Sequence, residues 1–161
     1  MPRLVKHAHR LDPMPDLVVR DLTPDDRDAW HPLWRGYQEF YETDIAEATT
    51  DVTWARFHDP AEPMRAFGAF LDERLMGIVH VIQHRSTWTV GDYLYLQDLF
   101  VDPEVRGTGA GRALIERVYA LADEVGASRV HWLTHETNTN AMLLYDRIAD
   151  RSGFVQYRKL R

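Results

Sequence analysis

The stretch best suited to chemistry is a loop with glycines at alternate positions, Gly107, Gly109 and Gly111, flanked by Arg106 and Arg112. Glycines lack a Cβ, so the backbone N–H groups of such a loop can crowd around an anion. A predicted helix follows at once, and a helix N-terminus adds unpaired donors and a partial positive charge. The two arginines add full charges. These residues favour a pyrophosphate site; the alternative is a glycine-rich turn that only caps a helix.

Two common phosphate-binding patterns do not fit this loop. The dinucleotide pattern would need glycine where Arg112 or Leu114 stands, and the P-loop pattern needs Gly-Lys-Ser/Thr, which the loop lacks. The spacing of Arg106, Gly109 and Gly111 instead resembles the coenzyme A signature of the GNAT superfamily of N-acetyltransferases. The resemblance implies acetyl-CoA as cosubstrate, with contacts from Leu99, Phe100, Val101, Arg106, Gly107, Thr108, Gly109, Ala110, Gly111 and Arg112.

A second signature follows in the chain. Asn138, Ala141, Leu144 and Tyr145, with the later pair Gly153-Phe154, match another pattern of the same superfamily. In that superfamily the asparagine contacts the coenzyme and the tyrosine hydroxyl protonates the departing thiolate. The resemblance therefore implies Asn138 as a coenzyme contact and Tyr145 as general acid. A phenol near the sulfur can donate this proton where water is excluded. Without the motif, a packed aromatic would be the simpler interpretation.

The resemblance covers residues 17–160 and is closest to the histone/polyamine and spermidine/spermine acetyltransferase branches. Those polyamine enzymes carry a glutamate, their proposed base, where this chain has Gln97. Glutamine cannot accept the proton and could only orient a water, which leaves Asp98, another carboxylate or solvent to receive it. Strand alternation places Gln97 and Asp98 on opposite faces unless a bulge intervenes.

The acceptor is expected to enter beside the first two helices. Their connection is acidic from Glu39 to Asp51, without an intervening lysine or arginine, and aromatic residues lie nearby. Acids with aromatics suit an ammonium group or a polycation, although a solvated acidic loop is the simpler alternative. The predicted acceptor contacts are Tyr37, Tyr41 and Glu42.

The elements that must position these residues follow from hydrophobic patterning and turn residues. Helices are predicted from Thr23 to about Tyr41 and over about 50–58, 109–125 and 138–150, and strands over 17–22, 64–71, 75–84, 93–101, 128–134 and 154–160. This order predicts an α/β (α+β) fold with a central mixed sheet flanked by about four helices. The resemblance implies the GNAT acyl-CoA N-acyltransferase fold. Residues 1–16 are interpreted as an N-terminal arm and residues 17–161 as a single N-acetyltransferase domain.

Composition excludes several classes of function. The 161 residues contain no cysteine, which removes disulfides, thiolate metal sites and cysteine nucleophiles. The net charge of −6 disfavours a sequence-independent nucleic-acid binder. The histidine spacings suit no metal site, and His80 is interpreted as a satisfied core histidine. No apolar run approaches membrane-spanning length and no secretory signal is evident, so we expect no membrane contact and a cytoplasmic location.

The residues and the resemblance together predict a reaction. We expect direct transfer of an acetyl group from acetyl-CoA to a primary amine of a small, cationic, polyamine-like acceptor, with the 99–101 backbone polarising the thioester carbonyl. The alternatives are a protein lysine or N-terminus, a free amino acid, or an acetyl-CoA sensor without catalysis. Only one strand fits after Phe154, which leaves a sheet edge open, so a homodimer is also expected.

Overall fold

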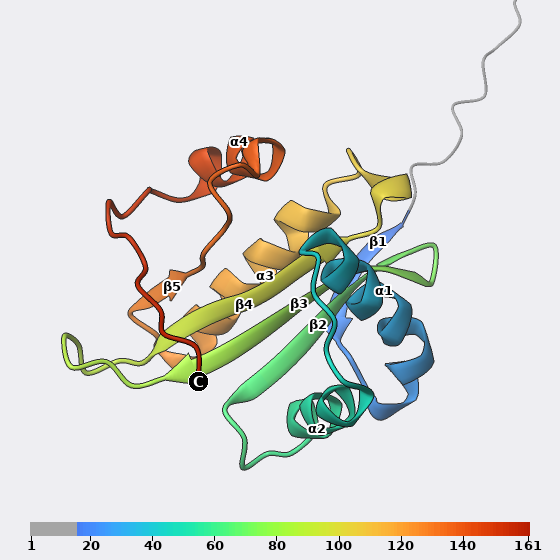
Figure 1. The fold of residues 1–161 in the computed structure, drawn as a ribbon, viewed down its shortest axis with the longest axis horizontal. Coiled ribbons are helices and arrows are strands. Elements are labelled where there is room, and N and C mark those ends of the chain that lie inside the picture. Colours follow the sequence, from blue (N-terminus) through green and yellow to red (C-terminus); the bar gives the residue numbers. More distant parts are fainter. Residues whose placement is uncertain (1–15) are drawn as a thin grey trace, which may run out of the picture.

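The computed structural model describes residues 16–161, and the predicted arm lies outside this range except for Asp16 (Figure 1). The elements in chain order are β1 (Leu17–Asp21), η1 (Pro24–Asp26), α1 (Arg27–Phe40), α2 (Glu47–Phe57), β2 (Met64–Leu71), β3 (Arg74–His84), β4 (Tyr93–Val101), η2 (Pro103–Val105), α3 (Ala110–Val125), β5 (Arg129–His131) and α4 (Thr139–Ile148). None of the helices within residues 16–161 is long and apolar enough to cross a membrane.

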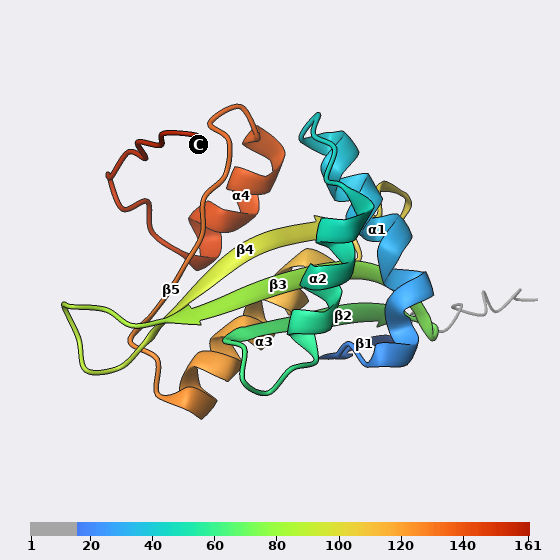
Figure 2. The ribbon, with the colours of Figure 1, turned by 60° about the horizontal axis from the view of Figure 1, so that its bottom comes forward.

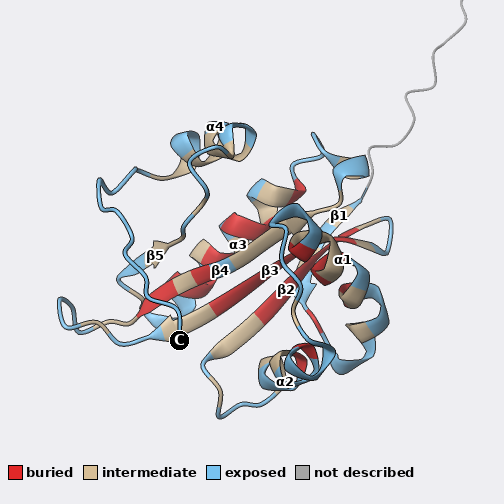
Figure 3. Cartoon of the chain, viewed as in Figure 1, coloured by how far each residue is buried: buried red, intermediate tan, exposed pale blue. Residues whose placement is uncertain are grey.

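The five strands form one mixed sheet in the order β1-β2-β3-β4-β5. The first four pair antiparallel, and β5 pairs parallel to β4 because α3 carries the chain back across the sheet. Helices α1 and α2 cover one face and α3 covers the other, as Figure 2 shows. The predicted architecture is therefore confirmed, with β3 as the buried central strand (Figure 3).

A separate apolar core lies on each face of the sheet. Leu114 and Val118 of α3 pack against Phe67 and Val79, and each fully buried side chain of this kind stabilises the fold by about 1.5–3 kcal/mol. On the other face, the aromatic residues of α1 differ in burial. Trp30 and Trp34 belong to the core, whereas Tyr37 is half-buried and Phe40 is exposed. The end of α1 therefore leaves aromatic side chains at the surface.

The prediction of a last strand over residues 154–160 is wrong. Residues 149–161 form no regular element, and Phe154 and Tyr157 are 78% and 93% exposed. A strand needs a neighbour to satisfy its backbone, and the tail has none within the described chain. Strand β5 is also shorter than the predicted 128–134, because it leaves the sheet after His131. Helix α2 begins at Glu47 rather than at residue 50.

Candidate active site

The glycine loop lies between β4 and α3. Asp102 caps η2 by accepting a hydrogen bond from the Glu104 N–H at 2.9 Å. Gly107 and Gly109 then both adopt φ +82°, the left-handed region that favours glycine, and α3 begins at Ala110. A Cβ built on either glycine would meet no atom within 4 Å, so the space above the loop is open.

The loop presents a run of backbone donors. The first hydrogen bond of α3 joins the Ala113 N–H to the Gly109 carbonyl, so the N–H groups of residues 107–112 find no acceptor within residues 16–161. Arg106 is exposed at the rim, and Arg112 forms an i,i+4 ion pair with Glu116 at 2.9 Å. Unpaired donors at a helix N-terminus, beside two arginines, fit a pyrophosphate.

Strand β4 offers an open edge next to this loop. It pairs with β5 only over Tyr93–Tyr95, but continues to Val101. From Leu96 onward its hydrogen-bonding groups on the β5 side face no strand of the described chain, while β3 pairs with the other side. The half-buried residues 99–101 lie on this edge. Their backbone groups can therefore pair with the amides of an extended ligand.

Helix α4 lies beside the glycine loop. The Tyr119 hydroxyl of α3 donates to the Ile148 carbonyl at 2.8 Å, which ties α4 to α3. A Cβ on Gly111 would lie 3.9 Å from Leu144 of α4. Asn138, the first residue before α4, donates from its Nδ2 to the Thr134 hydroxyl at 3.0 Å. The two signatures of the sequence are thus adjacent in space.

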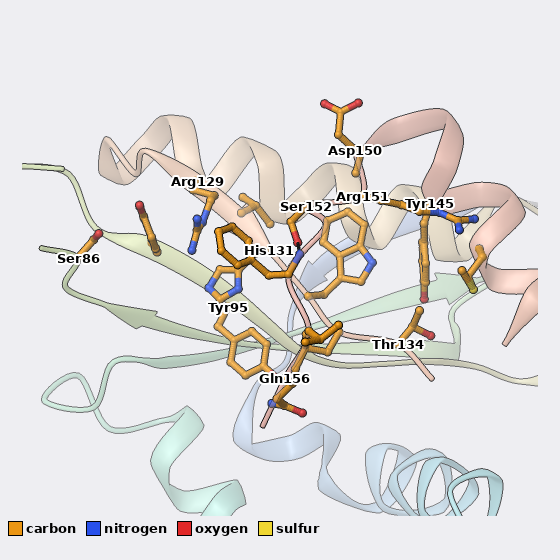
Figure 4. A pocket seen from close by; sticks show the side chains of 18 of the residues that line it. Ser86, Tyr95, Arg129, His131, Thr134, Tyr145, Asp150, Arg151, Ser152 and Gln156 are labelled. Atoms are coloured by element: carbon orange, nitrogen blue, oxygen red, sulfur yellow. Dashed lines mark hydrogen bonds between the residues drawn. The ribbon is translucent and has the colours of Figure 1, made fainter. Parts of the chain in front are cut away.

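Tyr145 is half-buried on α4, and its ring packs edge-on against Trp132 with centroids 5.4 Å apart. In Figure 4 its side chain extends from α4 toward Thr134. No hydrogen bond of its hydroxyl is found within residues 16–161. Burial, and then the neighbouring Tyr41 phenol, raise the pKa of Tyr145 to about 12. The phenol therefore keeps its proton at neutral pH and is free to donate it.

A β-bulge determines how Gln97 and Asp98 are presented. His80 of β3 pairs with Asp98 and Val81 pairs with Leu96, so Gln97 faces no residue of β3. As a result, Gln97 and Asp98 both line one cavity of about 340 Å³, instead of lying on opposite faces of a regular strand. The other residues that line this acceptor cavity are Trp34, Tyr37, Ile45, Thr53, Phe57, Met64, His80 and Ile82.

The predicted acceptor contacts separate in space. Tyr37 lines the acceptor cavity, and burial together with the charge of Asp98 raises the pKa of its phenol. Tyr41 packs on Tyr37 with ring centroids 4.8 Å apart, and it also neighbours Tyr145. Tyr37 and Tyr41 therefore join the cavity to Tyr145. Glu42 is exposed at the end of α1 and does not line the cavity.

The acidic connection is partly neutralised. Asp51 and Glu47 lie against Arg27, and Asp44 pairs with Arg35 at 2.9 Å. Both arginines belong to α1, so the sequence between Glu39 and Asp51 gave no sign of them. The negative charge that faces the cavity comes instead from Asp98 on β4.

Sequence reasoning missed a buried hydrogen-bonded chain under the cavity. Trp30 Nε1 donates to His80 Nε2 at 2.9 Å, and His80 Nδ1 lies 2.8 Å from Asp98 Oδ2. His80 is a satisfied core histidine, as predicted, but its partners come from α1 and β4. The one signal in the sequence was that a bulge in this strand would let Gln97 and Asp98 face the same side of the sheet.

A larger cavity, of about 780 Å³, lies between the β5 edge and the tail. Tyr145 and Thr134 line one end, and His131, Arg129 and Ser86 line the other (Figure 4). The Tyr145 end belongs to α4, the helix that packs beside the glycine loop. Within residues 16–161 no group of three or more His, Asp or Glu side chains could hold a metal ion.

Comparison with known proteins identifies relatives of this chain. A model of the acetyltransferase (GNAT) family matches residues 26–149. The D-amino-acid N-acetyltransferase HPA3 of Saccharomyces cerevisiae is 37% identical over 145 residues, which are 89% of this chain and 90% of that protein. A thialysine N-epsilon-acetyltransferase of Caenorhabditis elegans is 35% identical over 85 residues, 53% of this chain and 52% of that one.

Solved structures share the fold at lower identity. The aminoglycoside N-acetyltransferase AAC(6')-Iy in complex with CoA superposes with a TM-score of 0.79, covering 94% of this chain and 99% of that chain at 16% identity. The ribosomal-protein-alanine N-acetyltransferase of Brucella melitensis gives a TM-score of 0.75, covering 91% and 99% at 20% identity. The family match, the relatives and the fold agree with the two adjacent signatures: the chain belongs to the GNAT family of N-acetyltransferases.

Proposed function

We propose that this N-acetyltransferase moves the acetyl group of acetyl-CoA directly to a primary amine of a small, cationic, polyamine-like acceptor. The observation that carries the proposal is the acceptor cavity. Among residues 16–161, Asp98 is its one carboxylate, aromatic rings from α1 and α2 form its walls, and neither lysine nor arginine lines it. A carboxylate among aromatic faces attracts an ammonium group.

In this proposal, acetyl-CoA is bound by two other features of the site, the glycine loop and the open edge of β4. The glycine loop binds the pyrophosphate, and the open edge of β4 at residues 99–101 pairs with the amides of the pantetheine arm. Backbone N–H groups there polarise the thioester carbonyl, and Asn138 contacts the coenzyme. Tyr145 protonates the departing thiolate. Because amine and thioester already react with one another, holding them together supplies much of the acceleration.

The names of the relatives favour a second candidate acceptor, a free amino acid. The charge of the cavity bears on this choice. An α-amine would bring its own carboxylate close to Asp98, and no lysine or arginine of the described chain lines the cavity to offset the repulsion. An amine remote from any carboxylate avoids that cost. We therefore place a polyamine-like acceptor ahead of an α-amino acid.

The acceptor is tested by following release of free thiol from acetyl-CoA. The panel comprises spermidine, putrescine, thialysine, lysine, several D- and L-amino acids, an aminoglycoside and a histone-tail peptide. We expect kcat/KM for spermidine to exceed that for any α-amine by about tenfold or more. Turnover of D-amino acids alone would favour the second candidate. Binding of acetyl-CoA by calorimetry without any turnover would indicate a sensor, and absence of binding would contradict the pyrophosphate site.

We also propose that the protein acts in the cytoplasm as a homodimer. Strand β5 lies at the sheet edge, and the tail beyond it carries Phe154, Val155, Tyr157 and Leu160 as exposed apolar side chains. An edge that no other strand of residues 16–161 covers, beside exposed strand-forming residues, favours pairing with a second copy. The support for the cytoplasm is the cysteine-free sequence.

Deleting residues 153–161 is expected to convert a dimer into a monomer, because it removes the apolar side chains that a second copy would cover. Light scattering at micromolar concentration measures the mass. A control variant, Val90→Ser, removes an equally exposed apolar side chain from the β3–β4 connection and should leave the dimer intact. A full-length protein that is monomeric under these conditions contradicts the proposal.

A further inference from the structure

The buried chain Trp30–His80–Asp98 runs from the α1 core to the acceptor cavity. Trp30 is fully buried, His80 is 2% exposed, and the Asp98 side chain is 10% exposed. The His80 ring is held between neighbouring aromatic rings, with its centroid 4.6 Å from Phe57 and 5.0 Å from Trp34. A polar chain this deeply buried is costly unless every group is satisfied, and here each is hydrogen-bonded.

The direction of each hydrogen bond follows from the indole. An indole N–H can only donate, so Nε2 of His80 must carry the lone pair that accepts it. The ring proton of His80 then sits on Nδ1 and is donated to Oδ2 of Asp98. Both ring nitrogens are engaged, so His80 has no lone pair free to take a proton from the acceptor. Oδ1 of Asp98 takes no part in this chain.

We propose that Asp98 accepts the proton of the attacking amine and that Trp30 and His80 are positioning residues for its carboxylate. This rests on the proposed acetyl transfer. Gln97 and Tyr37 also line the cavity, but neither can serve as the base. The Gln97 amide does not accept a proton, and Tyr37 is a phenol that lies beside the Asp98 carboxylate. Asp98 is the one carboxylate that the described residues contribute to the lining, and the bulge at Gln97 turns it toward the cavity.

The reacting amine first loses its ammonium proton to solvent. The neutral amine then attacks the thioester carbonyl carbon, a C–N bond forms, and the C–S bond breaks. As the C–N bond forms, the nitrogen becomes strongly acidic, so a carboxylate can remove its proton. That proton passes to Oδ1 of Asp98, and the Tyr145 proton passes to the departing sulfur. Asp98 then loses its proton to solvent, and Tyr145 regains one from solvent.

The first test is Asp98→Asn. Asparagine keeps the shape and can still accept the His80 Nδ1–H, but it cannot take a proton. We expect kcat to fall by about 100-fold or more, with the Kd for acetyl-CoA unchanged. Asp92→Asn is the matched control, because the same exchange is made outside the cavity, where Asp92 bonds Gln83 and Arg85. Its kcat should stay within about twofold of wild type.

The positioning role is tested by Trp30→Phe, which keeps an aromatic ring in the core but removes the N–H donor to His80. Because the His80 ring is then held by Asp98 alone, with no donor to its Nε2, we expect kcat to fall about tenfold while the KM for acetyl-CoA is unchanged. Thermal melting of each variant confirms that it is folded. A merely structural role would lower the melting temperature without lowering kcat of the folded protein.

The outcomes separate the two proposals. If wild-type protein acetylates a small amine and Asp98→Asn keeps its kcat, the role of Asp98 is overturned while the proposed function stands. If wild-type protein acetylates no amine, the proposed function fails and this inference fails with it. If Asp98→Asn is slow but Trp30→Phe matches wild type, the positioning by Trp30 and His80 is overturned.

Discussion

Replacing Tyr145 with phenylalanine is expected to lower kcat by about 100- to 1,000-fold and to leave the Kd for acetyl-CoA unchanged. The substitution removes only the hydroxyl, and the ring can stay against Trp132. Without a nearby donor the thiolate must leave unprotonated or wait for water. Stopped-flow or steady-state thiol release gives kcat, and calorimetry gives the Kd.

Tyr119→Phe is the matched control for that variant. Its hydroxyl donates to the Ile148 carbonyl, so losing it should lower the free energy of unfolding by about 1 kcal/mol. The Tyr119 hydroxyl is engaged in structure, so kcat should change little. If Tyr145→Phe turned over as fast as Tyr119→Phe, the sulfur would not need the Tyr145 proton.

The raised pKa of Tyr145 gives the same proposal a pH signature. An acid must be protonated to donate, and a phenol with its pKa at about 12 remains protonated where an ordinary phenol, with a pKa of 10.0, begins to ionise. Between about pH 8 and about pH 10, kcat should therefore not decline, whereas an unshifted acid would lose about half its active form. A decline over that range, with the protein still folded, would contradict the shift.

Features governed by local backbone rules could be predicted from the sequence. Helix α3 begins one residue after the predicted 109 and ends at Val125, because Gly109 and Gly126 adopt the left-handed conformation that bounds it. The antiparallel strands 64–71 and 93–101 were confirmed to the residue, and β3 starts one residue early. Such elements are determined by turn residues and by the alternation of apolar and polar residues, both of which can be read from short stretches of sequence.

Features that depend on distant partners could not be predicted. The alternation of residues in β4 left Gln97 and Asp98 on opposite faces unless a bulge formed, and only the pairing with β3 resolves this. The partners of His80 lie 50 and 18 residues away, so nothing local marks the chain. The tail is strand-like in composition, yet it has no neighbour to pair with in the described chain.

The second large effect is expected at the glycine loop, where Gly109→Ala should raise the Kd for acetyl-CoA by about tenfold or more. Gly109 has φ +82°, which alanine adopts only at a cost, and its Cβ would enter the open space above the loop. That is the space into which the N–H groups of residues 107–112 must admit the pyrophosphate. Calorimetric titration with acetyl-CoA measures the change.

Gly126→Ala is the control that separates the loss of the pyrophosphate site from the backbone strain that alanine introduces at a positive φ. Gly126 has φ +68° at the other end of α3, and a Cβ there also meets no atom within 4 Å. Both variants should therefore lose about 1–2 kcal/mol of unfolding free energy by urea titration. Only Gly109→Ala should lose affinity, because only that end of the helix presents unpaired N–H donors. Equal affinities in the two variants would mean that the pyrophosphate binds elsewhere.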